Sequence, residues 1–411
     1  MADMQMGTTL PRLPERFQLT PEFRLVAACS WVAPESLAQA QADKIVELCN
    51  GHINWDLFIA LIKRHEVHAL AHASLSRHAG NGIPLPALET IRKHNSIVRR
   101  QSLFQTAELI RLIRLFSDSG VEVIPLKGVF LSQQIHGDPG MRSSVDLDIL
   151  VKPEQVDLAE QVLETAGYYC EFNNCAMTAV QKAHTRNHIH HMEFAHCKSG
   201  LHVELHWSLG PWLPEQVAVI WDHMTQAKWQ GVSINSLDNE ALLLVLCDHG
   251  ARHEWSNLKW LGDIAQLLTS ERITDWERLL SLARQLDLLR TLAHGVLLVH
   301  WLLDIQLPEE LRKLIRKEKQ ASSLSEKALP IMLMSAKELV GAGKRARSLK
   351  IAWKLKKLRP SLPYGVILKT VMVPLIDCQT IPLPAALFWL YYPLRPVLWF
   401  WRHYVKGHKQ P

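Results

Sequence analysis

The stretch VEVIPLKGVFLSQQIHGDPGMRSSVDLDILV, residues 121–151, predicts a strand, a tight turn, a helix, a loop and a second strand in that order. A short apolar run is closed by the turn at Leu126-Lys127-Gly128, and residues 129–135 have the composition of a helix. Glycine and proline between positions 136 and 144 indicate a loop. Residues 145–151 then alternate between apolar and acidic side chains, as a half-buried strand does.

The second predicted strand carries two carboxylates on one face. Asp146 and Asp148 are separated by a single residue, and side chains at that spacing point the same way. The opposite face takes the apolar residues Val145, Leu147, Ile149 and Val151. Neighbouring carboxylates repel each other, and a divalent cation such as Mg²⁺ relieves that repulsion. A solvated strand face is the alternative that these two residues alone leave open.

Two cationic residues flank this acidic strand. Lys127-Gly128 lies at a strand-to-helix turn, where backbone N–H groups and a helix N-terminus favour a phosphate group. Arg142 precedes Asp146 on the loop that leads into the acidic strand. A cation, a glycine turn and paired acids in this order indicate a binding site for a nucleoside triphosphate (NTP).

The composition is that of a globular protein with more than one domain. The chain has 411 residues, 48% of them hydrophobic, and its net charge of +6 does not by itself indicate a nucleic-acid partner. Its seven cysteines form no C-x-x-C pair, which favours free thiols in a reducing compartment and argues against a zinc knuckle. The sequence shows no apolar leader and no uncharged run long enough to cross a membrane, so we expect a cytoplasmic protein.

Further strands extend the predicted sheet. Residues 154–167 form an amphipathic pattern that predicts a helix, and residues 168–172 predict a return strand. Residues 184–207 predict a β-hairpin that turns at Lys198-Ser199-Gly200. A strand, a helix and paired strands in this order predict an α+β core.

The second strand of that hairpin places Glu204 on one face with His202 and His206. Histidines on paired strands are able to bind Zn²⁺ or another transition metal, although no cysteine completes a tetrahedral set. The alternative is that they contact a phosphate or an acceptor, act as a base, or hold the carboxylates in place. The histidines concerned are His188, His190, His191, His202 and His206.

The order of these motifs resembles the polymerase-β-like nucleotidyltransferase superfamily, and within it the bacterial family of uncharacterised nucleotidyltransferases. The resemblance covers residues 105–268 and rests first on the Leu126-Lys127-Gly128 turn, Arg142 and the Asp146-x-Asp148 strand. The family also has a V-[DE]-L-H-W segment, which Val203-Glu204-Leu205-His206-Trp207 matches. Its histidine-rich strand upstream of that segment is matched by His190-His191.

This resemblance implies a small mixed sheet flanked by N-terminal helices and a larger C-terminal helical domain. It implies an enzyme that uses Mg²⁺ or Mn²⁺ to move a nucleoside monophosphate from an NTP to a hydroxyl of a peptide, sugar or protein in a bacterial biosynthetic pathway. No specific nucleic-acid partner is expected.

The resemblance also assigns roles to particular residues. Asp146, Asp148 and Glu204 would be the catalytic and metal-binding carboxylates. The phosphates would be bound by Lys127, Gly128 and Arg142. Contact with the acceptor, or support of the carboxylates, would come from His190, His191, His206, His249 and Asp263.

The chain differs from the superfamily pattern at two points. Val129 follows the turn glycine where the superfamily usually has serine or glycine, and the spacing from Gly128 to Asp146 is longer than usual. The missing serine favours an alternative, a non-catalytic nucleotide-binding or scaffold protein docked to a membrane or a partner. Phosphoryl transfer at the same site is a third hypothesis.

The rest of the chain predicts helical regions on both sides of the core. We expect a flexible lead at residues 1–22, N-terminal helices at 23–104, the nucleotidyltransferase core at 105–235, a helical domain at 236–340 and a basic, aromatic tail at 341–411. The N-terminal helices are predicted at residues 35–48, 55–76 and 88–116.

Residues 237–268 predict a largely apolar helix with one polar stripe. The block H-x-x-x-H…W-x-x-L-x-W-L-x-D-I at residues 249–264 is again similar to the resembled family. At helical pitch the stripe contains His249, His253, Ser256, Trp260 and Asp263, and it would line the nucleotide site. Trp255 or Trp260 would then stack on a base. The alternative places both tryptophans in the core and makes Asp263 a cap or an ion-pair residue.

The tail combines a basic segment, residues 344–360, with aromatic segments that contain Pro393 and Pro396. The prolines prevent the tail from spanning a bilayer as a plain helix. This composition suits peripheral contact with the inner membrane, and equally a tail that packs back on the helical domain or dimerises. The basic run would also suit an acidic acceptor or leader peptide.

Overall fold

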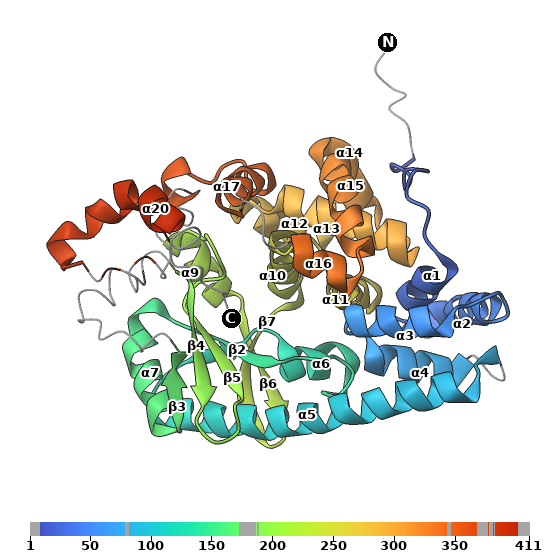
Figure 1. Ribbon diagram of the computed structural model, residues 1–411, viewed down its shortest axis with the longest axis horizontal. Coiled ribbons are helices and arrows are strands. Elements are labelled where there is room, and N and C mark those ends of the chain that lie inside the picture. Colours follow the sequence, from blue (N-terminus) through green and yellow to red (C-terminus); the bar gives the residue numbers. More distant parts are fainter. Residues whose placement is uncertain are drawn as a thin grey trace, which may run out of the picture.

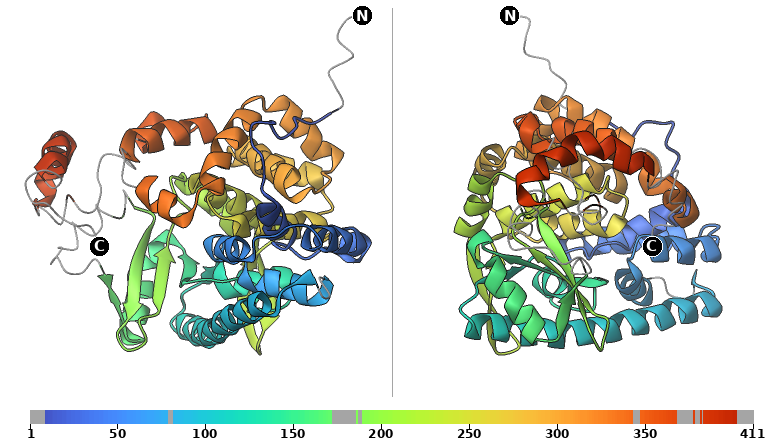
Figure 2. Two further views of the ribbon diagram at one scale, coloured as in Figure 1. Left: turned by 45° about the vertical axis from the view of Figure 1, so that its right-hand side comes forward. Right: turned by 60° about the vertical axis from the view of Figure 1, so that its left-hand side comes forward.

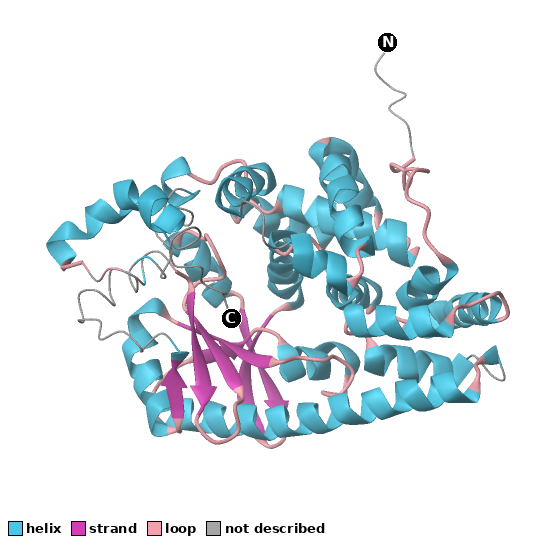
Figure 3. Ribbon diagram, in the orientation of Figure 1, coloured by secondary structure: helices cyan, strands magenta, loops and turns pink. Residues whose placement is uncertain are grey.

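The computed structural model describes residues 9–78, 82–171, 186, 189–342, 347–367, 377, 381 and 383–401. It is 63% helical, with a small mixed sheet among many helices, and so confirms the predicted α+β class. The strands gather in one part of the molecule, with helices on either side of them (Figure 3).

A five-stranded sheet contains the acidic strand. Its order is β1-β2-β5-β4-β3, in which β2 and β5 are parallel and the other neighbours are antiparallel. The strands are β1 (Val123–Pro125), β2 (Asp146–Val151), β3 (Tyr168–Cys170), β4 (His191–His196) and β5 (His202–His206). The predicted hairpin is therefore present as β4 and β5, and the acidic strand is β2.

The two faces of this sheet differ in character. One face buries apolar side chains of β2 and β5 in a common core: Leu147, Ile149, Val151, Val203 and Leu205. Asp146 and Asp148 belong to the other face, as their spacing predicts. The prediction that Val145 joins the apolar face is wrong, because β2 begins one residue later and Val145 is 71% exposed in the preceding loop.

The long helix α5 (Leu85–Asp118) supports the apolar face of the sheet. In Figure 1, and in the right view of Figure 2, it runs along the bottom of the molecule below the strands. It packs against α7 (Val156–Thr165), and towards its other end against α3 (Trp55–Arg64) and α4 (His68–His78). Its contribution to the core of the sheet is Leu109, Leu112, Ile113 and Phe116. One helix therefore connects the sheet to the N-terminal helices.

Helices from both ends of the chain share one hydrophobic core. Its buried residues run from Phe23 in α1 (Pro21–Ala28) to Leu358 in α17 (Arg347–Leu358). The remaining helices of these two regions are α2 (Glu35–Cys49), α10 (Asn239–Arg252), α11 (Leu258–Thr269), α12 (Trp276–Gln285), α13 (Leu289–Leu303), α14 (Glu309–Lys317), α15 (Gln320–Leu333) and α16 (Ala336–Ala342). We call the helices α1–α4, α10–α15 and α17, which share this core, the helical body.

The segment predicted as one helix at residues 55–76 is two helices. The chain turns between α3 and α4, where Glu66 has a positive φ of 56°. The apolar periodicity continues across this turn, which is why the sequence pattern does not reveal it. The turn brings Glu66 to the cavity described below.

The predicted polar stripe from His249 to Asp263 also spans two helices, so the prediction of one helix is wrong. Between α10 and α11 the chain turns at Glu254 and Trp255, which have positive φ values of 59° and 51°. Trp255 is fully buried, and a Cβ added to Gly250 would lie 2.2 Å from its ring. For Trp255 the structure therefore agrees with the alternative interpretation, a core residue.

The remaining elements include a hairpin that the sequence analysis did not predict. Its strands β6 (Met224–Trp229) and β7 (Val232–Leu237) are joined by Gln230 and Gly231, both with positive φ values, as a two-residue turn of this kind requires. The other elements are α6 (Gly128–His136), the 3₁₀ turn η2 (Pro153–Gln155) and α9 (Pro214–Asp222).

The tail contains η4 (Ala385–Leu390) and α20 (Tyr391–Phe400), which the left view of Figure 2 shows at the edge of the molecule. Phe388, Tyr391 and Leu398 are buried together in a small cluster of their own. The helix α20 continues through Pro396, so the expected interruption at this proline is wrong. None of the described helices has the length and apolar character needed to cross a membrane.

Some predicted features lie outside the described residues. They are residues 1–8 of the lead, Phe172, His184, His188, residues 344–346 and 368–376, and the end of the tail from residue 402.

We expect Gly262→Ala to destabilise the protein by about 3 kcal/mol, because overpacking at a rigid contact is costly. A Cβ at Gly262 in α11 would lie 2.1 Å from the carbonyl oxygen of Ser30, just beyond α1. Gly365→Ala is the matched control, since no atom lies within 4 Å of a Cβ there, and its effect should be below about 1 kcal/mol. Urea unfolding measures both. Equal stability of the two variants would contradict the close packing of α11 on the chain after α1.

Candidate active site

The acidic face of the sheet lines a cavity of about 470 Å³ between the sheet and the helical body. Its walls come from four parts of the chain: the turn between α3 and α4, the turn before α6 together with β2 and the loop before it, the strands β4 and β5 with their flanking residues, and the helices α10 and α11. Residues far apart in the sequence therefore meet here, the first being Glu66 and the last Trp260. The predicted residues Lys127, Arg142, Asp146, Asp148, His190, His191, Glu204, His206 and His249 all line this cavity.

The turn at Leu126-Lys127-Gly128 holds a cation beside the acidic strand. The Leu126 N–H donates to the carbonyl oxygen of Asp148 at 3.0 Å, which fixes the turn to β2. Gly128 has a positive φ of 68°, and a Cβ there would lie 3.4 Å from the Ser144 hydroxyl, so glycine is favoured. As a result, Nζ of Lys127 lies 2.7 Å from Oδ1 of Asp148.

Asp148 and Glu204 are neighbours across the parallel pair of strands. The register of β2 with β5 puts these two residues opposite each other. Nε2 of His206 lies 3.2 Å from Oδ1 of Asp148 and 3.1 Å from Oε2 of Glu204. One ligand atom from each of the three residues lies within 4.8 Å of the others, a spacing that would suit a metal ion.

Asp146 lines the same cavity but is not part of that group. Its partner in the β2–β5 register is His202, and its Oδ1 accepts a hydrogen bond from the Ser144 hydroxyl at 3.3 Å. The sequence predicts that Asp146, Asp148 and Glu204 act together. The structure brings the last two together with His206 and places Asp146 in the adjoining wall.

The carboxylates of this cluster differ in their electrostatic surroundings. Burial opposes the ionisation of Asp148, but Lys127 and His206 hold its pKa well below the usual range. Burial raises the pKa of Asp146, and the nearby carboxylates of Asp148 and Glu204 raise it further. For His206, hydrogen bonds to two carboxylates outweigh the effect of burial and raise its pKa. A bound cation would stabilise such a cluster.

Two more histidines lie beside this acidic cluster. The ring centroid of His191 lies 4.6 Å from that of His190 and 4.9 Å from that of His206. Burial lowers the pKa of His190 well below its ordinary value and that of His191 to about 4, so both rings are neutral at pH 7. His191, Glu193 and Glu204 form a second group whose ligand atoms lie within 4.8 Å of one another.

The all-histidine metal site considered from the sequence is not found among the described residues. The two candidate groups there combine carboxylates with a single imidazole each. His202 points elsewhere, with its Nδ1 3.6 Å from a carboxylate oxygen of Glu171. The remaining candidate ligand, His188, lies outside the described part of the chain.

Arg142 and Asp263 form a buried ion pair at the wall of the cavity. Nε of Arg142 lies 3.1 and 2.9 Å from the two carboxylate oxygens of Asp263, and the side chains are 4% and 3% exposed. Burial raises the pKa of Asp263, although the guanidinium of Arg142 opposes this effect. The pair connects the loop before β2 to α11. Because the Asp263 carboxylate is negative, it compensates part of the charge of Arg142.

The loop between Arg142 and β2 is also held by α5. Gln101 and Gln105 donate to the carbonyl oxygen of Ser144 at 3.0 and 3.2 Å. This places the Ser144 side chain beside the turn glycine, where it lines the cavity. Val129, by contrast, is fully buried in the core of the sheet. A hydroxyl therefore reaches the turn from position 144 and not from position 129.

Two cations in the cavity wall are not predicted by the sequence pattern. Lys259 forms an ion pair with Glu66 and lies 3.4 Å from the Ser143 carbonyl oxygen. Arg252 pairs with Asp248 at 3.0 Å. Arg252 belongs to α10 and Lys259 to α11, the region whose polar residues predict a nucleotide site. The positive charge of both side chains is the feature of the sequence that could have identified them as phosphate-binding candidates.

An aromatic cluster completes the wall formed by α10 and α11. The ring centroids of His249, His253 and Trp260 lie between 4.6 and 5.5 Å apart. Burial lowers the pKa of His249 well below its ordinary value, so this ring is neutral at pH 7. The polar stripe thus divides: these three residues face the cavity, whereas Asp263 is held by Arg142.

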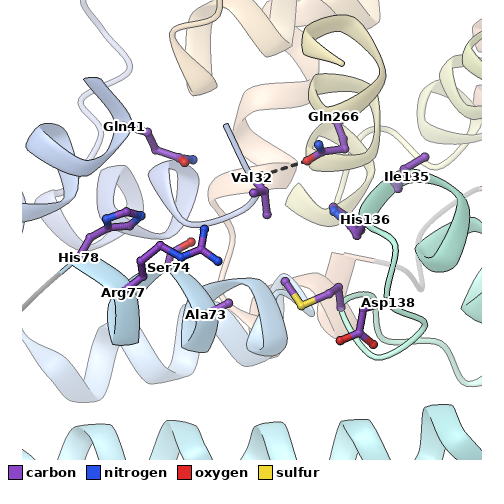
Figure 4. A pocket seen from close by; sticks show the side chains of 11 residues that line it. Val32, Gln41, Ala73, Ser74, Arg77, His78, Ile135, His136, Asp138 and Gln266 are labelled. Atoms are coloured by element: carbon purple, nitrogen blue, oxygen red, sulfur yellow. Dashed lines mark hydrogen bonds between the residues drawn. The ribbon is translucent and has the colours of Figure 1, made fainter. Parts of the chain in front are cut away.

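A smaller cavity, of about 210 Å³, lies at the other end of α6 (Figure 4). Its lining includes Arg77, His136, Asp138 and Gln266, whose amide oxygen accepts the Val32 N–H at 3.0 Å. Its one acidic side chain, Asp138, already pairs with Arg99. Without a second carboxylate, this cavity does not match the arrangement around Asp148.

Comparison with models of known protein families gives a match that covers this part of the chain. A family model described as "uncharacterised nucleotidyltransferase" matches residues 51–304. That range contains every side chain named above as lining the cavity of about 470 Å³. No curated protein and no solved structure matches the chain.

We expect Arg142→Leu to lower the free energy of unfolding by about 3–5 kcal/mol, because the Asp263 carboxylate would stay buried without a partner. The double variant Arg142→Leu/Asp263→Leu should regain much of that loss, since neither charge remains. Arg99→Leu is the control, because its exposed ion pair with Asp138 should contribute less than about 1 kcal/mol. Urea unfolding measures all three, and a double variant no more stable than Arg142→Leu would rule out this coupling.

Proposed function

Because the chain belongs to the family of uncharacterised nucleotidyltransferases, we propose that it transfers a nucleoside monophosphate from an NTP to an acceptor hydroxyl. The observation that carries the proposal is the alignment of Asp148 with Glu204 across β2 and β5, beside the ammonium group of Lys127. This combination offers both carboxylates for a divalent cation and positive charge for a triphosphate.

In this proposal Asp148 and Glu204 hold Mg²⁺ or Mn²⁺, with Asp146 and His206 beside them. The donor set supports the assignment, because carboxylate oxygens suit Mg²⁺ and Mn²⁺. The adjoining group of His191 and Glu193 shares Glu204 and would serve a second ion. When bound, such ions neutralise phosphate charge and lower the pKa of an acceptor hydroxyl.

Lys127, Gly128 and Arg142 bind the triphosphate in this proposal. The ammonium group of Lys127 now pairs with Asp148 and also lines the cavity, so it can exchange this carboxylate for phosphate oxygens. Gly128 is the first residue of α6, whose N-terminus favours an anion. Ser144 adds a hydroxyl beside the same turn.

The reaction is an in-line displacement at the α-phosphorus. The acceptor oxygen forms a bond to this phosphorus, the bond to the bridging oxygen of the β-phosphate breaks, and pyrophosphate leaves. The proton of the hydroxyl goes to Asp146, which lines the same cavity but lies outside the group of side chains that holds the cation. The neutral rings of His190, His191 and His249 face the acceptor, which is a hydroxyl of a peptide, sugar or protein.

We place this enzyme in the cytoplasm, with peripheral contact to a membrane through its tail. The support is a set of exposed apolar side chains on η4 and α20, together with the basic helix α17. The most exposed of them are Trp389 at 62% and Val397 at 61%. Aromatic residues beside basic ones suit the interface of an anionic membrane.

We expect Asp148→Asn and Glu204→Gln each to lower kcat by about 10³-fold, because each removes a carboxylate that holds the divalent cation, and the cation stabilises the charge of the transition state. Asp222→Asn, at the exposed end of α9, is the control and should keep full activity. The assay measures pyrophosphate release from each NTP with Mg²⁺, and with EDTA as the metal-free reference. Full activity of Asp148→Asn would remove the assignment.

Labelled NTPs distinguish this reaction from its two alternatives. With nucleotidyl transfer, label at the α-phosphate moves to the acceptor, whereas phosphoryl transfer would move label from the γ-phosphate instead. A non-catalytic nucleotide-binding protein, which the buried Val129 favours, would bind NTP and release no product.

We expect the full chain to co-sediment with vesicles of anionic lipid and to remain in solution with vesicles of phosphatidylcholine alone. Replacing Trp389 and Val397 together by serine should abolish sedimentation, because both apolar contacts are lost. A matched variant, Leu85→Ser, changes an exposed apolar residue far from the tail and should sediment as the native chain does. Equal sedimentation of both variants would contradict the membrane contact.

A further inference from the structure

A third cavity, of about 260 Å³, lies within the helical body and away from the acidic cluster. It is lined by the helices α10, α13, α15 and α17 and by Glu254 just after α10. Its apolar wall is formed by Ala251, Leu324, Ala328, Ile331 and Leu358. No carboxylate pair lines it, so its chemistry differs from that of the proposed NTP site.

One polar side chain lies inside this apolar wall. His294 of α13 lines the cavity and is 3% exposed, and neither of its ring nitrogens has a hydrogen-bond partner among the described residues. Burial lowers its pKa to about 3, so the ring is neutral and offers one donor and one acceptor. A buried polar group without a partner is costly, and a ligand that bonds to it would remove that cost.

Positive charge gathers at the rim of the same cavity. The ammonium groups of Lys327 and Lys357 lie 5.2 and 3.4 Å from the ring centroid of Trp353. Partial desolvation and the nearby charge of Lys327 lower the pKa of Lys357. Among the described residues neither lysine forms an ion pair with a carboxylate, whereas Lys354 pairs with Glu254 at 3.2 Å. Two like charges without a counter-ion favour an anion at this rim.

We propose that this cavity binds an organic anion: an apolar body between α15 and α17, an acidic group at Lys327 and Lys357, and a polar atom that bonds to His294. A phenolic carboxylate has all three features. The inference does not depend on the proposed nucleotidyl transfer, because binding here is measured without any turnover.

The site adjoins the catalytic cavity through the last turn of α10. Ala251 and Glu254 line the new cavity, while Arg252 and His253 line the catalytic one. Nζ of Lys354 donates to the carbonyl oxygen of Arg252 at 2.6 Å, which fixes α17 to this turn. The two cavities are therefore separate sites that share one wall.

Calorimetric titration of the full chain with three related probes tests the proposal. Hydroxyphenylpropionate should bind about tenfold more tightly than hydroxyphenylpropanol, which lacks the charge, and about fivefold more tightly than phenylpropionate, which lacks the hydroxyl. Lys327→Gln/Lys357→Gln should remove the first difference only. His294→Leu should remove the second difference only, and it should fold normally because it replaces an unpartnered polar group.

Two controls make the outcome decisive. Lys313→Gln/Lys317→Gln removes the same charge from α14 and should leave all three affinities unchanged. Ala328→Phe fills the cavity and should abolish binding of every probe, with thermal unfolding as the check that the variant is folded. Absence of saturable binding to the native chain, or equal binding to native and folded Ala328→Phe protein, would overturn the proposal.

Discussion

The parallel pairing of β2 with β5 is the constraint on which the rest of the structure depends. Parallel strands in register bring Asp148 and Glu204 side by side, and one face of each strand is fixed by the apolar core beneath. The chain cannot separate the two carboxylates without moving that core into water. Their repulsion must therefore be relieved locally, and here Lys127 and His206 relieve it.

The cations that line the cavity of about 470 Å³ are also paired with carboxylates. Besides Lys127, three cations line the cavity, and each has a carboxylate partner: Arg142 with Asp263, Lys259 with Glu66 and Arg252 with Asp248. These ion pairs keep buried charges compensated before any substrate arrives. They also join the sheet, the N-terminal helices and α10–α11 into one wall. A triphosphate would thus enter a site whose charges are already positioned, and would compete with protein carboxylates for them.

The sequence predicts local features of this site better than it predicts long-range ones. Alternation within a strand correctly places Asp148 and Glu204 on their faces, and the Lys127-Gly128 turn forms where the glycine indicates. Periodicity cannot show where a helix turns without a change in composition, so the turns at Glu66 and Trp255 were missed. Nor does it show which distant residues pair. The bond of Arg142 to Asp263, across 121 positions, depends on tertiary packing alone.

The shared core of the helical body has a consequence for synthesis of the chain. Helix α1 packs on α13, and the core that these helices share extends to Leu358 in α17. During translation the helices α1–α4 are therefore synthesised long before α10–α17, on which they pack. Their apolar faces stay exposed to solvent in the meantime. The sheet faces a shorter delay, since β5 follows β2 within the same segment. The N-terminal helices are therefore the part of the nascent chain that exposes apolar surface for the longest time.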